Sequence, residues 1–473
     1  MPFSQYQTAE FDFFGRPLFL VFLDLIVFHD SKRKVDMNER AIKDPSEVGR
    51  RPGATDFLFR LGPGLITGAA DDDPSGIATY SQAGATFGFG LLWTMVLTFP
   101  LMAAIQEICG RFGRITGTGI AESLRKCYPR PLVYSVVLLL CVANTFNLGA
   151  DVAAMGSAAQ LVVGGKASLY AVGLGLLSVI LEVAIPYRKY VLYLKWLTLV
   201  LFAYVATAFV VHVPWLAVLK ATLIPSFEWK SAYWMAIVAV LGTTISPYLF
   251  FWQSSQEAED VRLAHGESAL KKKPSQASSQ FRRIALDTRL GMAISNLVAF
   301  FIILTTAVTL HGRAGQLEIK TAADAAEALR PLAGHFAFLL FALGIVGTGL
   351  LAVPVLAGSA AYAVSETFHW RASLESKPKK APRFYGVIAA ATILGIALNS
   401  IGLDPIRALY WSAVLNGIVA VPLMFVLMVM SSNEKIVGQF RLPPMLRIFG
   451  WLGTIAMLVA SLGFLASVFT GVK

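Results

Sequence analysis

Charged residues are scarce in this sequence, and apolar residues are abundant. Asp, Glu, Lys and Arg make up 15% of its 473 residues, and hydrophobic residues make up 56%. A typical soluble protein is about 25% charged and about 45–50% apolar. The mean hydropathy is +0.63, and many separate apolar stretches exceed the roughly 20 residues that a helix needs to cross a bilayer. The scarcity of charge excludes an ordinary soluble domain and predicts an all-α protein that crosses the membrane many times.

Cysteine and catalytic motifs are also lacking. The three cysteines, Cys109, Cys127 and Cys141, lie at or near apolar segments and show no Cys-x-x-Cys spacing. That pattern excludes a disulfide framework and a zinc knuckle. The sequence contains no His-Glu-x-x-His or Gly-x-Ser-x-Gly motif, so we expect neither an enzyme nor a bound cofactor.

Negative charge is scarcer than positive charge, which gives a net charge of +11. The excess lies in alternate short loops between apolar segments, which follows the positive-inside rule rather than the pattern of a nucleic-acid groove. We expect the lipid bilayer as surroundings, no nucleic acid and no obligatory protein partner. The loops expected to be cytoplasmic carry Arg111, Arg114, Arg125, Lys126, Arg130, Arg188, Lys189, Arg262, Lys271, Lys272, Lys273, Arg282, Arg283, Arg371, Lys377, Lys379, Lys380, Arg383, Lys435 and Arg441.

Eleven membrane spans follow from the apolar stretches. An odd number of spans, with the basic loops inside, predicts a multi-pass protein of the plasma (inner) membrane with a cytoplasmic N-terminus and an external C-terminus. Residues 1–55 are expected to form a disordered cytoplasmic leader. The expected spans are roughly 61–88, 89–110, 131–162, 168–186, 190–211, 232–256, 286–310, 333–364, 384–402, 406–430 and 448–470.

The first span contains a polar break. It carries Asp71, Asp72 and Asp73 in succession, followed directly by Pro74. Proline removes a backbone donor and clashes with the preceding turn, so an ordinary helix cannot continue here. Unwound backbone at membrane depth survives only where it is buried in protein or lines a cavity, and ionisable residues there mark ion or substrate paths. Asp73-Pro74 is therefore predicted to form half of a cation site. Asp71 and Asp72 either line an aqueous vestibule or cap the half-helix.

The sixth span repeats this oddity at residues 242–249, with Pro247 flanked by Ser246 and Tyr248. Breaks at corresponding positions of two five-span halves point to an inverted-repeat transporter with its site at the midplane. We therefore predict a first repeat over 56–212 and a second over 232–431, with broken helices 1 and 6. An external loop over 213–231 joins them, and 432–473 holds the last span and the C-terminus.

Hard oxygen ligands dominate both breaks. Asp73 offers a carboxylate, and hydroxyls or the carbonyls freed at the half-helix ends come from Ser75, Thr243, Thr244 and Ser246. The predicted metal site takes Asp73, Thr243 and Ser246 from this set, and the family resemblance described below adds Gly76. Such a set suits Mg²⁺, Ca²⁺ or Mn²⁺, and no thiolate or thioether is expected near the breaks. One carboxylate is too little to strip Mg²⁺ of its water. We therefore expect a roomy pocket for a partly hydrated ion.

Other polar residues in the spans admit two interpretations. Gln253 either lines the inner exit or belongs to an ordinary polar helix end. Asn416 either faces the site or makes a packing hydrogen bond. Ser246 and Thr243 either contact the ion or bond back to their own helix, as hydroxyls commonly do.

These motifs resemble a known family. Gly62-Pro63-Gly64, Asp73-Pro74 and Gln82-Ala83-Gly84 look like the first helix of the Nramp divalent-metal transporters, whose pattern is Gly-Pro-Gly, Asp-Pro-Gly-Asn and Gln-Ala-Gly. The resemblance covers about 61–430 and implies the fold of the amino-acid/sodium symporters.

Three departures from the family pattern concern selectivity. Gly76 stands where the family has its metal-binding Asn, Ser246 where it has Met, and Tyr248 where it has His. The chain is similar in this to the Nramp-related magnesium transporter branch. Because a thioether favours softer ions, its loss implies a carrier for Mg²⁺, with Mn²⁺ as a second substrate.

Proton coupling is expected to be absent or weak. The third span, where the family carries acidic residues, has Asp151 but asparagines nearby, including Asn147. Uncoupled entry is sufficient, since a divalent ion gains about 4.6 kcal/mol across 100 mV. The alternatives are a proton-coupled Mn²⁺/Fe²⁺ transporter of the ordinary Nramp type, or an amino-acid symporter of the same fold. Asp73 would repel the carboxylate of an amino acid.

Overall fold

The computed structural model describes residues 62–185, 190–191, 197–264, 266–312, 319–399, 402 and 404–470. All regular elements within these ranges are helices, as predicted. The leader expected over 1–55 lies outside the described residues.

The first half of the described chain runs from the first broken helix to the end of the fifth span. Its elements are α4 (Pro63–Asp71), α5 (Pro74–Phe87), η2 (Gly88–Leu91), α6 (Leu92–Thr116), α7 (Ile120–Cys127), α8 (Arg130–Val163), α9 (Ala167–Ala184), η3 (Leu197–Leu201) and α11 (Phe202–Val210).

A connecting helix, the second half and a final span follow. These elements are α12 (Trp215–Leu223), α13 (Ser231–Thr244), α14 (Pro247–Leu263), η4 (Pro274–Gln276), α15 (Ala277–Thr309), α16 (Ala322–Ala326), η5 (Glu327–Leu329), α17 (Arg330–Ala333), η6 (Gly334–Phe336), α18 (Ala337–Thr367), η7 (Pro378–Lys380), α19 (Pro382–Leu398), α20 (Pro405–Ser431), α21 (Glu434–Val437) and α22 (Pro444–Phe469).

The described helices account for the eleven expected spans. Eight helical segments are long and apolar enough to cross a membrane, and two shorter apolar ones cover Leu197–Val210 and Pro382–Leu398. One of the eight, Pro74–Thr116, contains parts of both the first and the second expected span. The chain is therefore a multi-pass helical protein.

Both breaks are present and share one construction. α4 ends at Asp71 and α5 begins at Pro74, while α13 ends at Thr244 and α14 begins at Pro247. In each case two residues are non-helical, and a proline opens the second half-helix. Proline is favoured there because its missing N–H is one that a helix start leaves unpaired. The broken helices 1 and 6 are confirmed.

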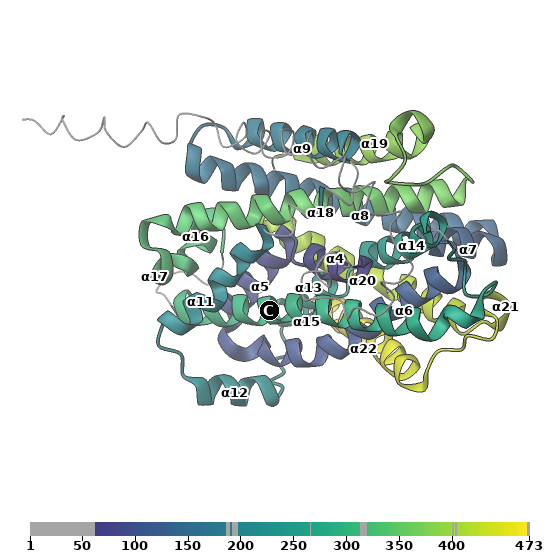
Figure 1. Ribbon diagram of the computed structural model, residues 1–473. Helices are drawn as coiled ribbons and strands as arrows, with labels where there is room; N and C mark the ends of the chain where they lie inside the picture. The colour runs from purple at the N-terminus through teal and green to yellow at the C-terminus, as the bar shows by residue number, and fades with distance from the viewer. Residues whose placement is uncertain are drawn as a thin grey trace, which may run out of the picture. The chain divides into compact units, whose positions relative to one another are not determined.

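Close backbone contacts hold the first half-helices against their neighbours. A Cβ at Gly68 would lie 2.3 Å from the carbonyl carbon of Gly291 on α15, and one at Gly242 would lie 2.2 Å from the carbonyl oxygen of Ala413 on α20. Small residues let membrane helices approach in this way. Figure 1 shows α4, α5, α13 and α20 in the middle of the helices, between α8 and α18 on one side and α15, α6 and α22 on the other.

The start of α4 is bound to α15 as well. The backbone N–H groups of Gly64 and Leu65 donate to Asp287 Oδ2 at 2.9 Å and to Asp287 Oδ1 at 3.2 Å. These N–H groups have no partner within their own helix, and a carboxylate is favourable at the positive end of the helix dipole. Asp287 therefore caps α4 from a distant part of the chain.

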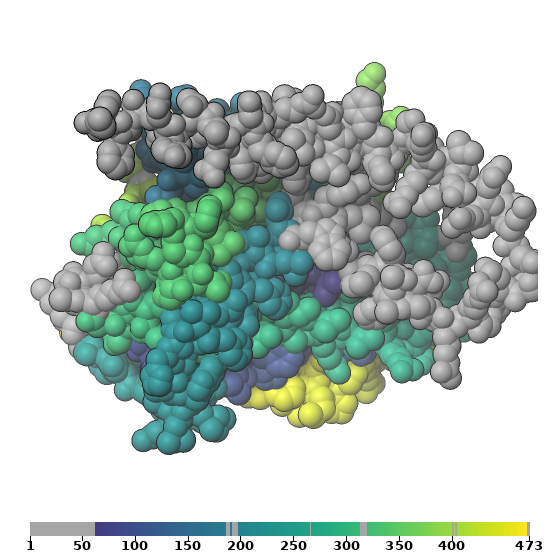
Figure 2. Space-filling model, turned by 60° about the vertical axis from the view of Figure 1, so that its left-hand side comes forward, coloured from purple at the N-terminus to yellow at the C-terminus, as the bar shows by residue number. Residues whose placement is uncertain are grey.

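The connecting segments are more helical than predicted. The polar, lysine-rich composition of 257–285 predicts a loop, but this stretch contains the end of α14 and the start of α15. The predicted loop 213–231 contains α12. Pro331 follows an alanine-rich stretch and predicts a helix end there, but it lies in the first turn of α17. In Figure 2, the blue-green surface near residues 200–224 lies beside the green surface near residues 320–345. α11 belongs to the first of these regions and α17 to the second, and the two helices are in contact.

Candidate divalent-cation site

Asp73 lies at the centre of the first break and caps its own half-helix. Its Oδ1 accepts hydrogen bonds from Ser75 Oγ at 2.6 Å and from the Gly76 N–H at 2.8 Å. Aspartate is a preferred residue immediately before a helix because its oxygen satisfies the exposed N–H groups of the first turn. One oxygen of Asp73 is therefore held by the local sequence.

The other oxygen, Oδ2, connects Asp73 to distant helices. It accepts from Asn147 Nδ2 on α8 at 3.1 Å and from Tyr248 Oη on α14 at 3.2 Å. Asn147 Oδ1 in turn accepts from Ser412 Oγ on α20 at 2.8 Å. Asp73 is 1% exposed, so its carboxylate is enclosed by protein donors in this conformation rather than opening on the roomy pocket that the sequence predicts.

Asp71 and Asp72 share one partner. Ser295 Oγ on α15 lies 2.7 Å from Asp71 Oδ2 and 3.0 Å from Asp72 Oδ1, and Asp71 Oδ1 is buried without a partner. The two residues are 0% and 4% exposed, so they line no aqueous vestibule here. Asp71 is the last residue of α4 and Asp72 is its C-cap residue, where the exposed carbonyls of the helix end make a carboxylate unfavourable.

A fourth buried carboxylate lies close by. Asp151 on α8 is 0% exposed and lies within electrostatic range of Asp73. Among the residues that the structure describes, none of these four acids forms an ion pair with a lysine, arginine or histidine. Burying unpaired carboxylates is very costly, and cations or protons remove that cost. The arrangement is therefore suited to attracting a cation.

The second break contributes hydroxyls beside the first. Thr243 Oγ1 would lie 3.2 Å from a Cβ at Gly76, so these two predicted residues are adjacent. Ser246 Oγ lies within hydrogen-bond reach of two carbonyl oxygens of the preceding half-helix α13, Gly242 at 3.0 Å and Thr243 at 2.8 Å. Ser246 thus bonds back to the end of α13.

Two predicted pathway residues, as far as the structure describes them, have no hydrogen bond with Asp73. Gln253 is buried in the middle of α14, where its Nε2 donates to Thr288 Oγ1 on α15 at 2.7 Å. Asn416 is buried, and neither atom of its amide has a partner among the described residues. The predicted packing hydrogen bond of Asn416 is therefore not found there.

One sulfur atom lies closer to the first break than the sequence indicates. Met155 Sδ on α8 would lie 2.5 Å from a Cβ at Gly349 on α18, and Pro74 Cγ would lie 3.4 Å from the same point. The Met155 side chain therefore lies near the Pro74 ring, which is not one of the oxygen-bearing groups of the predicted site. Met155 is far from both breaks in the sequence, and only the packing of α8 and α18 brings it to Pro74.

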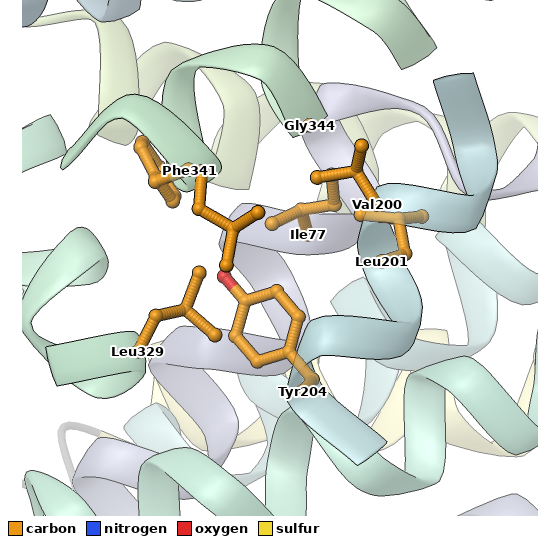
Figure 3. A pocket seen from close by; sticks show the side chains of 8 residues that line it. Ile77, Val200, Leu201, Tyr204, Leu329, Phe341 and Gly344 are labelled. Carbon is orange, nitrogen blue, oxygen red and sulfur yellow. The ribbon is translucent and has the colours of Figure 1, made fainter. Parts of the chain in front are cut away.

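A small, mostly apolar cavity is lined in part by Ile77, the residue that follows Gly76. Figure 3 shows the Tyr204 hydroxyl pointing in among aliphatic side chains. With no carboxylate in its lining, this cavity is not the cation site. It is lined by Ile77, Val200, Leu201, Tyr204, Leu329, Leu340, Phe341 and Gly344.

Sequence reasoning missed three residues beside the acids: Ser295, Ser412 and Met155. Each lies in an apolar span without a proline or a charge beside it, so local composition gives little signal. Ser412 precedes Asn416 by one helical turn, and that spacing on one helix face is the one clue the sequence holds.

Comparison with known proteins agrees with this fold. The sequence model of the family described as "Natural resistance-associated macrophage protein-like" (Nramp) matches residues 64–467. The divalent metal cation transporter MntH of Klebsiella pneumoniae (strain 342) is 28% identical over 420 residues, which cover 86% of this chain and 94% of that protein.

Two solved structures share the architecture. The Eremococcus coleocola manganese transporter, in complex with an aromatic bis-isothiourea substituted compound, has a TM-score of 0.68 at 19% identity and covers 89% of each chain. Mhp1, a nucleobase-cation-symport-1 family transporter in a closed conformation, has a TM-score of 0.52 at 14% identity and covers 87% of this chain and 93% of that one.

The family match extends over most of the chain and includes both broken helices and the buried carboxylates between them. Membership also agrees with the absence of catalytic motifs noted in the sequence. The chain belongs to the Nramp family and is a divalent metal transporter, not an enzyme.

Proposed function

We propose that this transporter carries Mg²⁺, with Mn²⁺ as a second substrate, by alternating access and without moving protons. The observation that carries the proposal is that Ser246 stands where the Nramp pattern has a methionine. Its hydroxyl bonds to carbonyls of the preceding half-helix α13. Without that sulfur, the groups at the break are hard oxygens, which suit Mg²⁺.

The site also supports an ion that keeps some of its water. Beyond Asp73, the groups next to Gly76 are neutral oxygens such as Thr243 Oγ1. Mg²⁺ dehydrates reluctantly and is usually held by one or two carboxylates with several waters. The pairing of Asp73 with hydroxyls and amides fits that mode of binding.

The absence of proton coupling is supported by two neutral neighbours of Asp73. Tyr248, at the position of the family's histidine, donates to Asp73 Oδ2 or to the Ala70 carbonyl, and a phenol keeps its proton at neutral pH. Asn147 supplies an amide that carries no titratable proton. The membrane potential alone drives a divalent ion inward by about 4.6 kcal/mol per 100 mV.

A second candidate function is proton-coupled transport of Mn²⁺ or Fe²⁺. The thioether of Met155 beside Pro74 and the buried acid Asp151 favour it. An amino-acid symporter is disfavoured, since the acids at the break would repel the substrate carboxylate.

We further propose the plasma (inner) membrane as the location, with the N-terminus cytoplasmic and the C-terminus external. The basic loops support this orientation. The matched proline breaks support inverted repeats over 56–212 and 232–431, joined by 213–231 and followed by 432–473.

Uptake into proteoliposomes tests the proposal. Mg²⁺, Mn²⁺ and Ca²⁺ are compared for the parent and Asp73→Ala, with a membrane potential imposed and a pH-sensitive dye inside. We expect Mg²⁺ entry without acidification, and its loss in Asp73→Ala. Acidification that tracks metal entry would establish the coupled alternative. Undiminished Mg²⁺ entry through Asp73→Ala would remove the site, and Mn²⁺ entry without Mg²⁺ entry would remove the magnesium assignment.

A further inference from the structure

We propose that Asn147 is a cation ligand that turns its amide on binding, replacing the amide ligand that Gly76 lacks. In the arrangement that the structure shows, its nitrogen holds Asp73, and with a cation bound its oxygen would face the ion. The proposal rests on the cation site described above and deepens it.

The first step concerns which oxygen of Asp73 is available to an ion. Oδ1 is bound at 2.6 and 2.8 Å by Ser75 Oγ and the Gly76 N–H, and these bonds cap α5. Oδ2 is bound at 3.1 and 3.2 Å by Asn147 and Tyr248. Shorter hydrogen bonds to a carboxylate are the stronger ones. An ion therefore displaces the donors of Oδ2 rather than those of Oδ1.

The two donors of Oδ2 differ in what they can do once displaced. The Tyr248 hydroxyl lies 3.0 Å from the Ala70 carbonyl oxygen and can donate there instead. Asn147 Nδ2 is buried and would point its N–H groups at a cation, which is repulsive. Half a turn of the amide exchanges its nitrogen and oxygen in nearly the same space.

Ser412 allows that turn without leaving a polar atom unpaired. Its hydroxyl hydrogen has two acceptors within reach, Asn147 Oδ1 at 2.8 Å and the Leu409 carbonyl oxygen at 2.6 Å. When the hydrogen goes to Leu409, the Ser412 oxygen is free to accept from the turned Asn147 nitrogen. The network therefore has two complete hydrogen-bond arrangements, one for each state.

The spacing fits two neighbouring ligands of one divalent cation. Asn147 Nδ2 lies 3.1 Å from Asp73 Oδ2, so the turned amide oxygen would occupy a point about that far from the carboxylate oxygen. Adjacent oxygens of an octahedral Mg²⁺ site are about 2.8–3.0 Å apart, and the equatorial oxygens of a seven-coordinate Ca²⁺ site are about 2.7–3.1 Å apart. The two oxygens can therefore bind the same ion, and their spacing alone does not select Mg²⁺ over Ca²⁺.

The test measures Mg²⁺ binding to the purified full-length transporter by calorimetry, together with KM and Vmax of uptake. Asn147→Leu keeps the size of the side chain and removes the amide. We expect the dissociation constant and KM for Mg²⁺ to rise by about 10–100-fold. A dissociation constant within twofold of the parent would overturn the proposal, as would a loss of Vmax alone, which is what a merely structural role predicts.

Two further variants keep the proposal testable if Asn147→Leu does not fold. Ser412→Ala removes the acceptor of the turned amide and should weaken Mg²⁺ binding by about threefold to tenfold, whereas Ser412→Thr, which keeps the hydroxyl, should bind like the parent. Equal binding by both would overturn the two-arrangement network.

Asn147→Asp keeps an oxygen beside Asp73 and loses the donor. Two adjacent carboxylates share a proton that the ion must displace, so Mg²⁺ binding should fall steeply as the pH is lowered and recover at alkaline pH. Binding as independent of pH as that of the parent would count against the proposal.

The outcomes also separate this inference from the proposed function. Undiminished uptake in Asp73→Ala would contradict both the proposed function and the role of Asn147. Loss of uptake in Asp73→Ala, together with unchanged Mg²⁺ binding in Asn147→Leu, would contradict only the role of Asn147.

Discussion

The two broken helices share a backbone and differ in chemistry. Each has two non-helical residues and then a proline, Pro74 or Pro247. The first break holds three buried acids. The second holds hydroxyls such as that of Ser246, which bonds to the end of α13. The backbone is thus interrupted in the same way at both breaks, but the side chains place acidic groups only at the first. The second break contributes neutral oxygen atoms.

The largest expected difference between the breaks comes from two separate substitutions. One removes the charge of Asp73 at the first break, and the other removes the hydroxyl of Ser246 at the second. Asp73→Asn keeps an oxygen that can accept the cap bonds from Ser75 and Gly76, but it loses the charge. We expect Mg²⁺ uptake to fall by about 100-fold or more, beyond the loss typical of residues behind the ligands. Ser246→Ala should change uptake by less than about threefold. Similar losses in both would show that the hydroxyl at the second break contributes as much to transport as the charge at the first.

A methyl group distinguishes the two breaks by packing. A Cβ at Gly242 would lie 2.2 Å from the Ala413 carbonyl oxygen, whereas the nearest atom to a Cβ at Gly76 is Thr243 Oγ1 at 3.2 Å. Gly242→Ala should therefore destabilise the protein by about 1–3 kcal/mol, as overpacking does. Thermal unfolding in detergent measures this. Gly76→Ala is the matched control and should unfold near the parent temperature.

Restoring sulfur at the second break tests selectivity. Ser246→Met places a thioether where the Nramp pattern has one. We expect the ratio of Mn²⁺ to Mg²⁺ uptake to rise by about tenfold, which corresponds to about 1.4 kcal/mol. Met155→Leu serves as the control, and its ratio should stay unchanged. If Met155→Leu lowers Mn²⁺ uptake instead, the thioether beside Pro74 is the one that acts.

The smallest effect is expected at Tyr248. Tyr248→Phe removes a donor that already has the Ala70 carbonyl as a second acceptor. A neutral hydrogen bond contributes about 0.5–1.5 kcal/mol, and sharing reduces that, so Mg²⁺ affinity should change by less than about threefold. A larger change, measured by calorimetry, would place Tyr248 alongside Asn147 in holding Asp73.

The breaks could be predicted from the sequence because they are local. Asp73-Pro74 and Ser246-Pro247 disrupt a helix by their own covalent chemistry. Ser412 could not, because its partner Asn147 is 265 residues away and only helix packing brings them together. The polar stretch 257–285 was predicted to be a loop, yet Arg283 pairs with Glu257 at 2.6 Å, and such pairs let α14 and α15 extend beyond the apolar spans.

Asp287 helps to fix the position of the short helix α4, which is bound to α15 at both of its ends. One end of α4 is held by Asp287 of α15, and the other end carries Asp71 and Asp72, bound to Ser295 of the same helix. At 1.5 Å per residue, its nine residues form a rod of about 13 Å. α4 is thus fastened to α15 at both ends, and α5 packs against the same helix. A cation at Asp73 therefore lies at the junction of two half-helices that both rest on α15, rather than at a free hinge between them.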